Sequence, residues 1–325
     1  MEKESTIKDK MKSGIINIAE YVEAITALTN KNDYKYFYRG QKRNYHEDYK
    51  EDQDYKTIKK QIVNTLKPSL YRDSKLVENE HLLFKEFILR NPNDFKDEKT
   101  AFEKLVKMQH YGLPTRLLDI TSNALIALYF ACEGASSNDG FVSVFRIKDD
   151  QIKFYDSDTV SVISNIAKRP AHIAEDINLT ALDLTEFSKS VVDHKGCQDF
   201  FDRKGLEVFN EYPAVQYLLH EIKEEKPYFK DCIKYEHLNQ YYCVKPLLSN
   251  RRIIRQDGAF LLFGMGDTKF DCPEIKSNTA VIKIKKDEKD SILKQLEHLG
   301  ISKDKVYPEM EKVAEYLKDE CLKAE

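Results

Sequence analysis

Hydrophobic and polar positions along this chain follow two periods, and each period predicts its own kind of element. Apolar residues at helical spacing predict helices over residues 15–25, 78–89, 98–109, 160–167 and 213–223, then one that ends at Gly300 and one after Met310. Alternating or continuous apolar runs predict strands over residues 34–40, 141–147, 241–246 and 279–284, with another after the turn at Gly258. Helices and strands thus alternate along the whole chain.

This alternation predicts one α+β domain over residues 1–325, with a mixed central sheet flanked by helices. No internal repeat or low-complexity linker divides the chain. We expect the core in about residues 30–148 and 240–315. Residues 149–239 show helical pieces but no catalytic spacing, so we interpret them as an insertion.

The most distinctive pattern lies at residues 107–122, where a helix end, a tight turn and a short strand follow one another. Gly112 is placed to end the helix in the left-handed conformation. Residues 124–132 have no polar face, which predicts a buried helix, and they are too few to cross a bilayer. Thr121 or Ser122 is expected to cap that helix, because a side-chain oxygen there can accept a hydrogen bond from an unpaired backbone N–H group.

The predicted short strand carries Thr115, Arg116 and Asp119. Asp119 and Thr121 would then lie near the positive end of a buried helix, where a phosphate is favoured. Alternatively, Arg116 and Asp119 form a buried ion pair that fixes the strand. The residues leave both interpretations open.

An aromatic-rich strand ends in Arg39 and Gly40. An arginine beside a glycine that lets a ligand approach the backbone suits a carboxylate or phosphate partner. The alternative is that Arg39 braces a neighbouring loop.

A second cluster of candidates precedes the hydrophobic strand after Gly258. Gln256 is expected at the mouth of that strand. Arg251, Arg252 and Arg255 give a local positive field that suits nucleic acid, or they are only the basic flank of a core strand.

Composition narrows the classes of protein. With 325 residues, 41% of them hydrophobic and 33% charged, the chain can bury a large core and remain soluble. Its net charge of -3 argues against a protein that coats nucleic acid, so any such contact must be local. The charged start of the chain does not have the pattern of a signal peptide or membrane anchor, and we expect a cytoplasmic protein.

Signatures of known chemistry are absent. The six cysteines and eight histidines have no metal-ligand spacing, so no metal is expected. The sequence has no GxGxxG after a strand, no Walker loop, no HExxH and no GxSxG.

Four stretches resemble the FRG-domain family. The first is Tyr38, Arg39 and Gly40, in which tyrosine replaces the phenylalanine of the Phe-Arg-Gly motif. The second is the most specific match and consists of residues 109–119, Thr121 and residues 127–131. The third lies within residues 252–260 and the fourth within residues 296–309. Together they extend from about residue 30 to 315 and leave about 150–235 unmatched.

The order of these parts is similar to that of ADP-ribosyltransferases, which implies a core of that type with NAD as co-substrate. In this comparison Arg39 holds the NAD phosphate or ribose, Asp119 or Thr121 supports the pocket, and Gln256 orients the nicotinamide ribose. His110 and Tyr111 line the pocket and stack on nicotinamide or take a proton. The cofactor-binding residues implied are Arg39, Gly40, Gln41, His110, Tyr111, Thr115, Arg116 and Thr121, and the catalytic ones are Arg39, His110, Asp119 and Gln256.

Gln256 departs from the pattern, because a neutral amide cannot supply the carboxylate that many such transferases use. Asp257, Asp119 or Glu309 could supply it instead. If none does, the domain binds a nucleotide without turnover.

The resemblance therefore implies an NAD-dependent ADP-ribosyltransferase that acts as a bacterial toxin or anti-phage effector, restrained by a possible antitoxin or chaperone protein. Nucleic acid, RNA or DNA, is the favoured target, through Arg251, Arg252 and Arg255. The alternatives are a protein target, a non-catalytic module that binds nucleotides or nucleic acid, and a hydrolase that uses Asp119 and His110.

Overall fold

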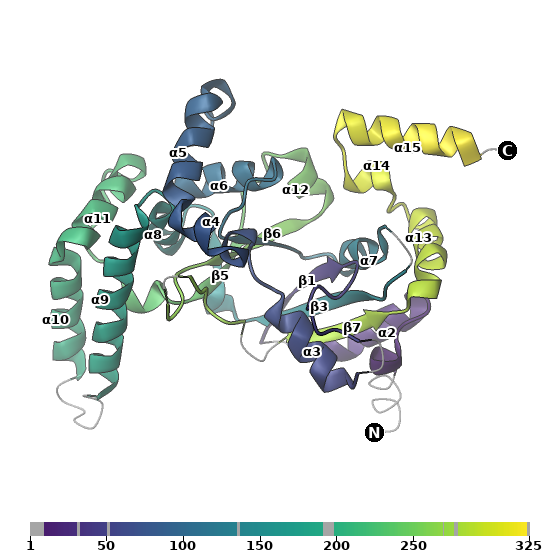
Figure 1. Cartoon of the computed structure of the whole chain (residues 1–325), viewed down its shortest axis with the longest axis horizontal. Helices are drawn as coiled ribbons and strands as arrows, with labels where there is room; N and C mark the ends of the chain where they lie inside the picture. The colour runs from purple at the N-terminus through teal and green to yellow at the C-terminus, as the bar shows by residue number, and fades with distance from the viewer. Residues whose placement is uncertain are drawn as a thin grey trace.

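The computed structural model describes residues 10–30, 33–50, 53–134, 137–190, 198–268, 270–275 and 279–323. Their centre is a sheet of seven strands in the order β4-β5-β6-β2-β1-β3-β7 (Figure 1). The strands are β1 (Lys35–Gln41), β2 (Leu117–Thr121), β3 (Gly140–Ile147), β4 (Ile152–Phe154), β5 (Tyr241–Lys245), β6 (Gly258–Phe263) and β7 (Thr279–Ile284). Neighbouring strands pair antiparallel, except that β4 and β5 pair parallel. The predicted α+β fold with a mixed central sheet is confirmed, although the short β4 was not predicted.

Helices cover both faces of this sheet (Figure 1). They include α2 (Ile18–Leu28), α3 (Tyr55–Asn64), α4 (Ser74–Glu78), α5 (Glu80–Arg90), α6 (Ala101–His110), α7 (Ala124–Cys132), α8 (Asp158–Ile166), α9 (Ala171–Ser190), α10 (Gln198–Glu211), α11 (Pro213–Glu225), α12 (Arg251–Arg255), α13 (Lys289–His298), α14 (Lys303–Val306) and α15 (Met310–Lys323). On one face α7 packs against β1 and β3, with α2 and α13 outside it. On the other face α3 packs against β3 and β7. Strand side chains alternate between the faces, so Val144 lies toward α7 and Phe141 toward α3.

Helix α2 begins later than its apolar pattern predicts. Gly14 has a φ of 101°, and Ile15 forms an isolated parallel β-bridge with Ile284. Asn17 then caps α2 by accepting a hydrogen bond from the backbone N–H of Glu20. Ile15 is buried because it extends the edge of the sheet, so the predicted helical start at this residue is wrong.

The apolar helix α7 has a different cap from the predicted one. The side chain of Asn123 accepts hydrogen bonds from two backbone N–H groups in the first turn. Thr121 is the last residue of β2; its hydroxyl donates to the Gln256 carbonyl at 2.6 Å and accepts from the Asn123 N–H at 3.0 Å. The prediction of Thr121 or Ser122 as the cap is therefore wrong, because Thr121 joins β2 to the segment before β6.

Helix α7 packs directly on the backbone of strand β1 at Gly40. A Cβ atom on Gly40 would lie 2.0 Å from the Ala127 carbonyl oxygen and 2.7 Å from the Ala131 nitrogen. These are backbone atoms, so the helix itself would have to move. Gly40→Ala is therefore expected to lower the free energy of unfolding in urea by about 1–3 kcal/mol. Gly258→Ala is the matched control, since its Cβ would meet its nearest neighbour at 3.4 Å, and equal losses in the two variants would contradict the prediction.

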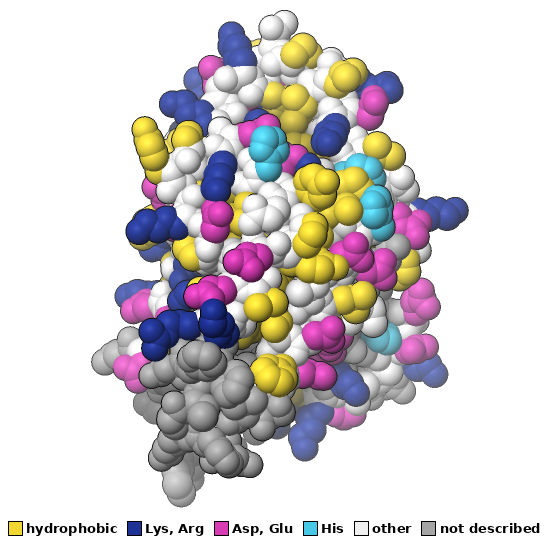
Figure 2. Space-filling model, turned by 90° about the vertical axis from the view of Figure 1, so that its left-hand side faces the viewer, with side chains coloured by type: hydrophobic (Ala, Val, Ile, Leu, Met, Phe, Trp, Pro, Cys, Tyr) yellow, Lys and Arg dark blue, Asp and Glu magenta, His cyan; other side chains and the backbone are white. Residues whose placement is uncertain are grey.

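Residues 149–239 contribute to two parts of the structure. Strand β4 joins the sheet, and Val160 and Ile163 of α8 pack with Phe260 and Leu262 of β6. Helices α9, α10 and α11 form a lobe beyond that end of the sheet and share a second core (Figure 1). Over the face of the molecule in Figure 2, hydrophobic side chains lie among basic and acidic ones. None of the helices in the described ranges is long and apolar enough to cross a membrane.

Candidate functional site

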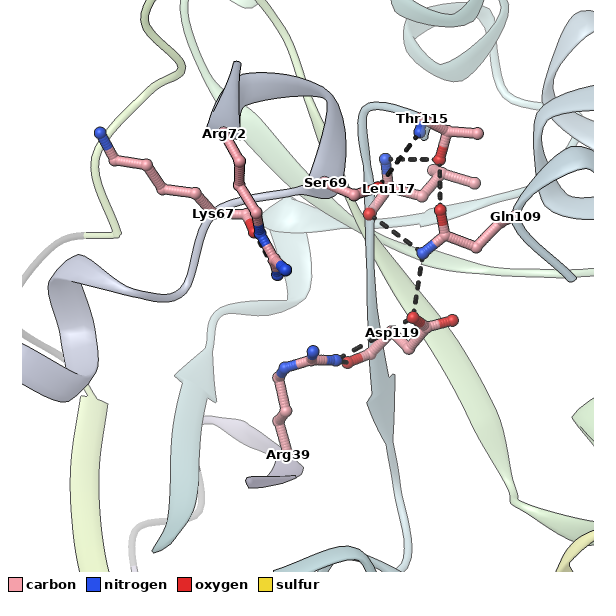
Figure 3. Close-up of polar contacts among 8 residues, drawn as sticks. All are labelled: Arg39, Lys67, Ser69, Arg72, Gln109, Thr115, Leu117 and Asp119. Carbon is pink, nitrogen blue, oxygen red and sulfur yellow. Dashed lines mark hydrogen bonds and ion pairs between the residues drawn. The ribbon is translucent and has the colours of Figure 1, made fainter. Parts of the chain in front are cut away.

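The neighbouring strands β1 and β2 separate after one residue pair. Strand β1 pairs with β3 along its whole length, but it pairs with β2 only between Tyr38 and Thr121. Next to that pair, Arg39 donates a hydrogen bond of 2.6 Å from Nη1 to the backbone carbonyl of Asp119. The guanidinium therefore bridges the opening between the two strands (Figure 3).

A chain of hydrogen bonds fixes the carboxylate of Asp119 (Figure 3). The buried hydroxyl of Thr115 donates to Oε1 of Gln109 at 2.6 Å. Nε2 of Gln109 then donates to the Leu117 carbonyl at 3.3 Å and to Oδ2 of Asp119 at 2.9 Å. Because Oε1 is occupied as an acceptor, the amide must point its donors at Asp119. The Asp119 side chain is nevertheless 57% exposed, so its remaining acceptor positions face solvent.

The charge of Arg39 lies in a partly desolvated position. Its side chain is 23% exposed, and Nη1 lies 4.0 Å from Oδ2 of Asp119. Burial lowers the pKa of Arg39, Asp119 raises it, and the positive charge of Arg72 lowers it. An arginine remains protonated despite such shifts. A guanidinium has five donor hydrogens, so most of those on Arg39 remain available to a ligand.

His110 is the last residue of α6 and lies in the same electrostatic environment. Its Nδ1 lies 3.1 Å from the side-chain nitrogen of Asn250. Burial and Arg252 lower the pKa of His110, whereas Asp119 and Glu309 raise it. The net direction is downward, so the imidazole is neutral at pH 7 and can accept a proton.

Arg252→Gln is expected to raise the pKa of His110, because it removes a positive charge that opposes protonation. The measurement is an NMR titration of the imidazole signals, which should give a wild-type pKa below the ordinary 6.5. Arg251→Gln, a change to the exposed neighbour of Arg252, is the control and should leave the value unchanged. An unchanged pKa in Arg252→Gln would show that Arg252 does not contribute and that burial causes the downward shift.

The segment that holds these side chains matches one known domain. Residues 34–140 match the FRG domain. The chain carries an FRG domain. Arg39, Gln109, His110 and Asp119 all lie inside it. No curated protein and no solved structure matches the chain.

The two predicted resemblances within this range, the motif that includes Arg39 and the motif of residues 109–119, are thereby confirmed as parts of an FRG domain. The match ends at residue 140, so the resemblance of residues 252–260 and 296–309 stays a prediction. The described residues contain no group of three or more His, Cys, Asp or Glu side chains placed to hold a metal ion.

The FRG motif glycine has a packing role in this fold. The backbone of α7 approaches Gly40 closely, which by itself requires a glycine here, and the approach of a ligand to Gly40 stays a prediction. Gln41 is buried on the opposite side of β1, where Nε2 lies 3.4 Å from the Thr65 hydroxyl. Tyr111 is 68% exposed beyond the end of α6. Of these three residues, Tyr111 presents the most surface to solvent.

Arg116 forms an ion pair with Glu80 and not with Asp119. It lies just before β2, is 2% exposed, and pairs with Glu80 of α5. Its Nε donates to Glu80 at 2.8 Å and Nη1 to the Phe263 carbonyl at 3.2 Å, while Nη2 contacts the second Glu80 oxygen. The predicted pair of Arg116 and Asp119 is wrong, because Asp119 lies at the strand opening with Arg39. These contacts also occupy the guanidinium of Arg116, so few of its hydrogen-bond donors remain for a cofactor.

Gln256 lies two residues before β6, as predicted, and its side chain bonds to the segment that follows α13. It follows the last turn of α12, and Nε2 donates to the Val306 carbonyl at 3.1 Å. A pocket lies beside that contact; Asn123, Ile126, Arg255, Gly300, Ile301, Lys305 and Val306 line it. Among the described contacts, none joins Gln256 to Arg39 or Asp119.

The three arginines of α12 differ in their surroundings. Arg251 and Arg255 are exposed, whereas Arg252 lies 3.7 Å from Glu309 and stacks over the ring of Tyr307. Arg251 and Arg255 therefore retain charges that a phosphate could neutralise, and Arg255 also lines the pocket near Gln256.

Sequence analysis missed two residues of this site. Gln109 lies within the motif of residues 109–119, and its position one residue before His110 at a helix end was the available signal. Arg72, whose charge acts on Arg39, is 33 positions away in the sequence and belongs to no motif. Only the fold brings it to β1.

Proposed function

We propose that this chain is an NAD-dependent ADP-ribosyltransferase that acts as a toxin or anti-phage effector, with nucleic acid as the favoured acceptor. The observation that supports it best is the meeting of Arg39 and Asp119 at the opening between β1 and β2. A guanidinium suits the phosphates of NAD, and a carboxylate suits the positive charge that develops on its ribose.

The proposed reaction breaks the bond between the nicotinamide nitrogen and the ribose carbon. The bonding electron pair leaves with nicotinamide, which makes the ribose oxocarbenium-like, and an acceptor nucleophile then bonds to that carbon. Asp119 stabilises this positive charge while Gln109 and Thr115 keep its carboxylate in place. His110, neutral at pH 7, takes the proton that the acceptor loses on its Nδ1, which gives up its contact with the Asn250 amide as it is protonated.

Asp119 fills the role that the neutral Gln256 cannot. Among the carboxylates considered, Asp119 lies beside Arg39, whereas Asp257 accepts a hydrogen bond from Asn123 and Glu309 faces Arg252. The assignment therefore separates anion binding by Arg39 from charge stabilisation by Asp119.

Acceptor binding is assigned to the exposed arginines of α12. Arg251 and Arg255 suit the phosphates of RNA or DNA, because each contact releases counterions from the nucleic acid. A protein acceptor is the alternative, and an antitoxin or chaperone protein is a proposed partner that would restrain the activity.

The side-chain contact of Gln256 favours a second candidate function. Its amide is held by the Val306 carbonyl and carries no charge, which is compatible with a module that binds a nucleotide without turnover. Such a module would bind NAD at Arg39 and release no nicotinamide.

Incubation of the purified protein with NAD labelled in its adenylate part tests the proposal. Nicotinamide release and label transfer are followed separately with total RNA, total DNA and cell lysate. Arg39→Ala should abolish both signals, and Arg90→Ala is the matched control, since Arg90 is an exposed arginine of α5 that pairs with Glu86. Transfer to one fraction identifies the acceptor class, whereas NAD binding without release supports the binding module. Equal activity in Arg39→Ala and the wild type would exclude this site.

A further inference from the structure

Arg72 is held rigidly although its side chain is exposed. It ends the short 3-10 helix η1 (Ser69–Arg72), whose Leu70 is fully buried and whose Leu70 N–H donates to the Thr115 carbonyl at 3.3 Å. The preceding residue, Tyr71, donates its hydroxyl to the Gly264 carbonyl at 2.7 Å. These contacts tie η1 to the start of β2 and to the end of β6. The backbone of Arg72 is thus positioned relative to Arg39 by buried structure.

The charges at this position are unbalanced. Arg72 donates from Nη2 to the Lys67 carbonyl at 3.2 Å, and within the described residues it forms no ion pair. Figure 3 shows its side chain extending from η1 toward the region that Arg39 enters from β1. Two like charges that face one region repel each other. An anionic ligand between them would replace that repulsion by two charge-assisted contacts.

We propose that Arg39 and Arg72 hold the two phosphoryl groups of a nucleoside diphosphate, one on each side of the opening between β1 and β2, and that Arg72 makes the site select a diphosphate over a monophosphate. A planar guanidinium donates two parallel hydrogen bonds to phosphate oxygens, so two arginines match two linked phosphoryl groups. The assignment of Arg39 as the phosphate residue rests on the proposed function, but the binding of a diphosphate does not require turnover.

Binding of ADP-ribose, ADP and AMP by isothermal titration calorimetry tests this assignment on the full chain. The wild type should bind ADP-ribose and ADP more tightly than AMP. Arg72→Ala should weaken the binding of ADP and ADP-ribose by about 10- to 100-fold. Its effect on the binding of AMP should be much smaller, so that the preference for ADP is lost. Arg72→Lys should recover only part of the affinity, because an ammonium cannot donate two parallel hydrogen bonds. Arg90→Ala should bind as the wild type does.

The outcomes separate this proposal from that of turnover. Tight ADP binding that depends on Arg72, without nicotinamide release from NAD, would support the diphosphate site and contradict the transferase. NAD turnover by the wild type, together with an ADP affinity that is unchanged in Arg72→Ala, would support the transferase and contradict the diphosphate site. If Arg72→Ala weakened the binding of ADP and AMP equally, the role of Arg72 in selecting a diphosphate would be overturned. Urea unfolding of each variant excludes loss of the fold as the cause.

Discussion

Asp119→Asn is expected to lower the rate of NAD cleavage by about 10²- to 10³-fold with little change in the affinity for NAD. Asparagine has nearly the same shape, and its side-chain oxygen can still accept the hydrogen bond from Gln109. The backbone carbonyl that Arg39 contacts is unchanged. The substitution therefore removes the negative charge and little else. That charge is what stabilises an oxocarbenium-like transition state.

The measurement is kcat and KM for nicotinamide release, with NAD affinity taken from calorimetry. Asp257→Asn and Glu309→Gln remove the other two carboxylates considered, and each should retain activity close to that of the wild type. Asparagine also tolerates the φ of 46° at Asp257, so that control preserves the backbone. A loss confined to Asp257→Asn or Glu309→Gln would move the catalytic carboxylate away from Asp119.

The sheet was predictable because strand alternation is a local property of the sequence. The segments that became β3 and β7 are bounded by turns and rich in β-branched or aromatic residues, and they formed at the predicted positions. The end of α6 was also predictable, because Gly112 takes the expected left-handed conformation with a φ of 81°. The start of α2 was not, since the burial of Ile15 depends on Ile284, which is distant in the sequence.

The site was less predictable, because its partners are set by tertiary contacts. Motifs identified Arg39, His110 and Asp119, and the structure brings Arg39 to Asp119. They could not show that Arg116 pairs with Glu80, because a sequence contains many carboxylates and gives no distance between them. Residues of one motif also diverge: Arg116, just before β2, is buried against Glu80, whereas Asp119 of β2 lies at the strand opening.

Arg116→Met is expected to lower the free energy of unfolding by about 3–5 kcal/mol, because it leaves the buried carboxylate of Glu80 without its partner. Burial opposes the charged form of Arg116, but the adjacent Glu80 carboxylate raises its pKa overall, so the native pair is ionised. The double variant Arg116→Met, Glu80→Leu removes both charges and should recover most of the loss. Urea unfolding of the single and double variants measures this coupling.

The surface pair of Arg90 and Glu86 provides the matched control. Its side chains are 74% and 54% exposed, so Arg90→Met should change the free energy of unfolding by less than about 1 kcal/mol. A structural Arg116 and a cofactor-binding Arg116 then predict opposite results. If Arg116→Met folds as stably as the wild type but fails to bind ADP-ribose, Arg116 is a binding residue and the ion pair contributes little. If stability is lost and the double variant restores both folding and ADP-ribose binding, Arg116 supports the strand and the ligand is held by other side chains.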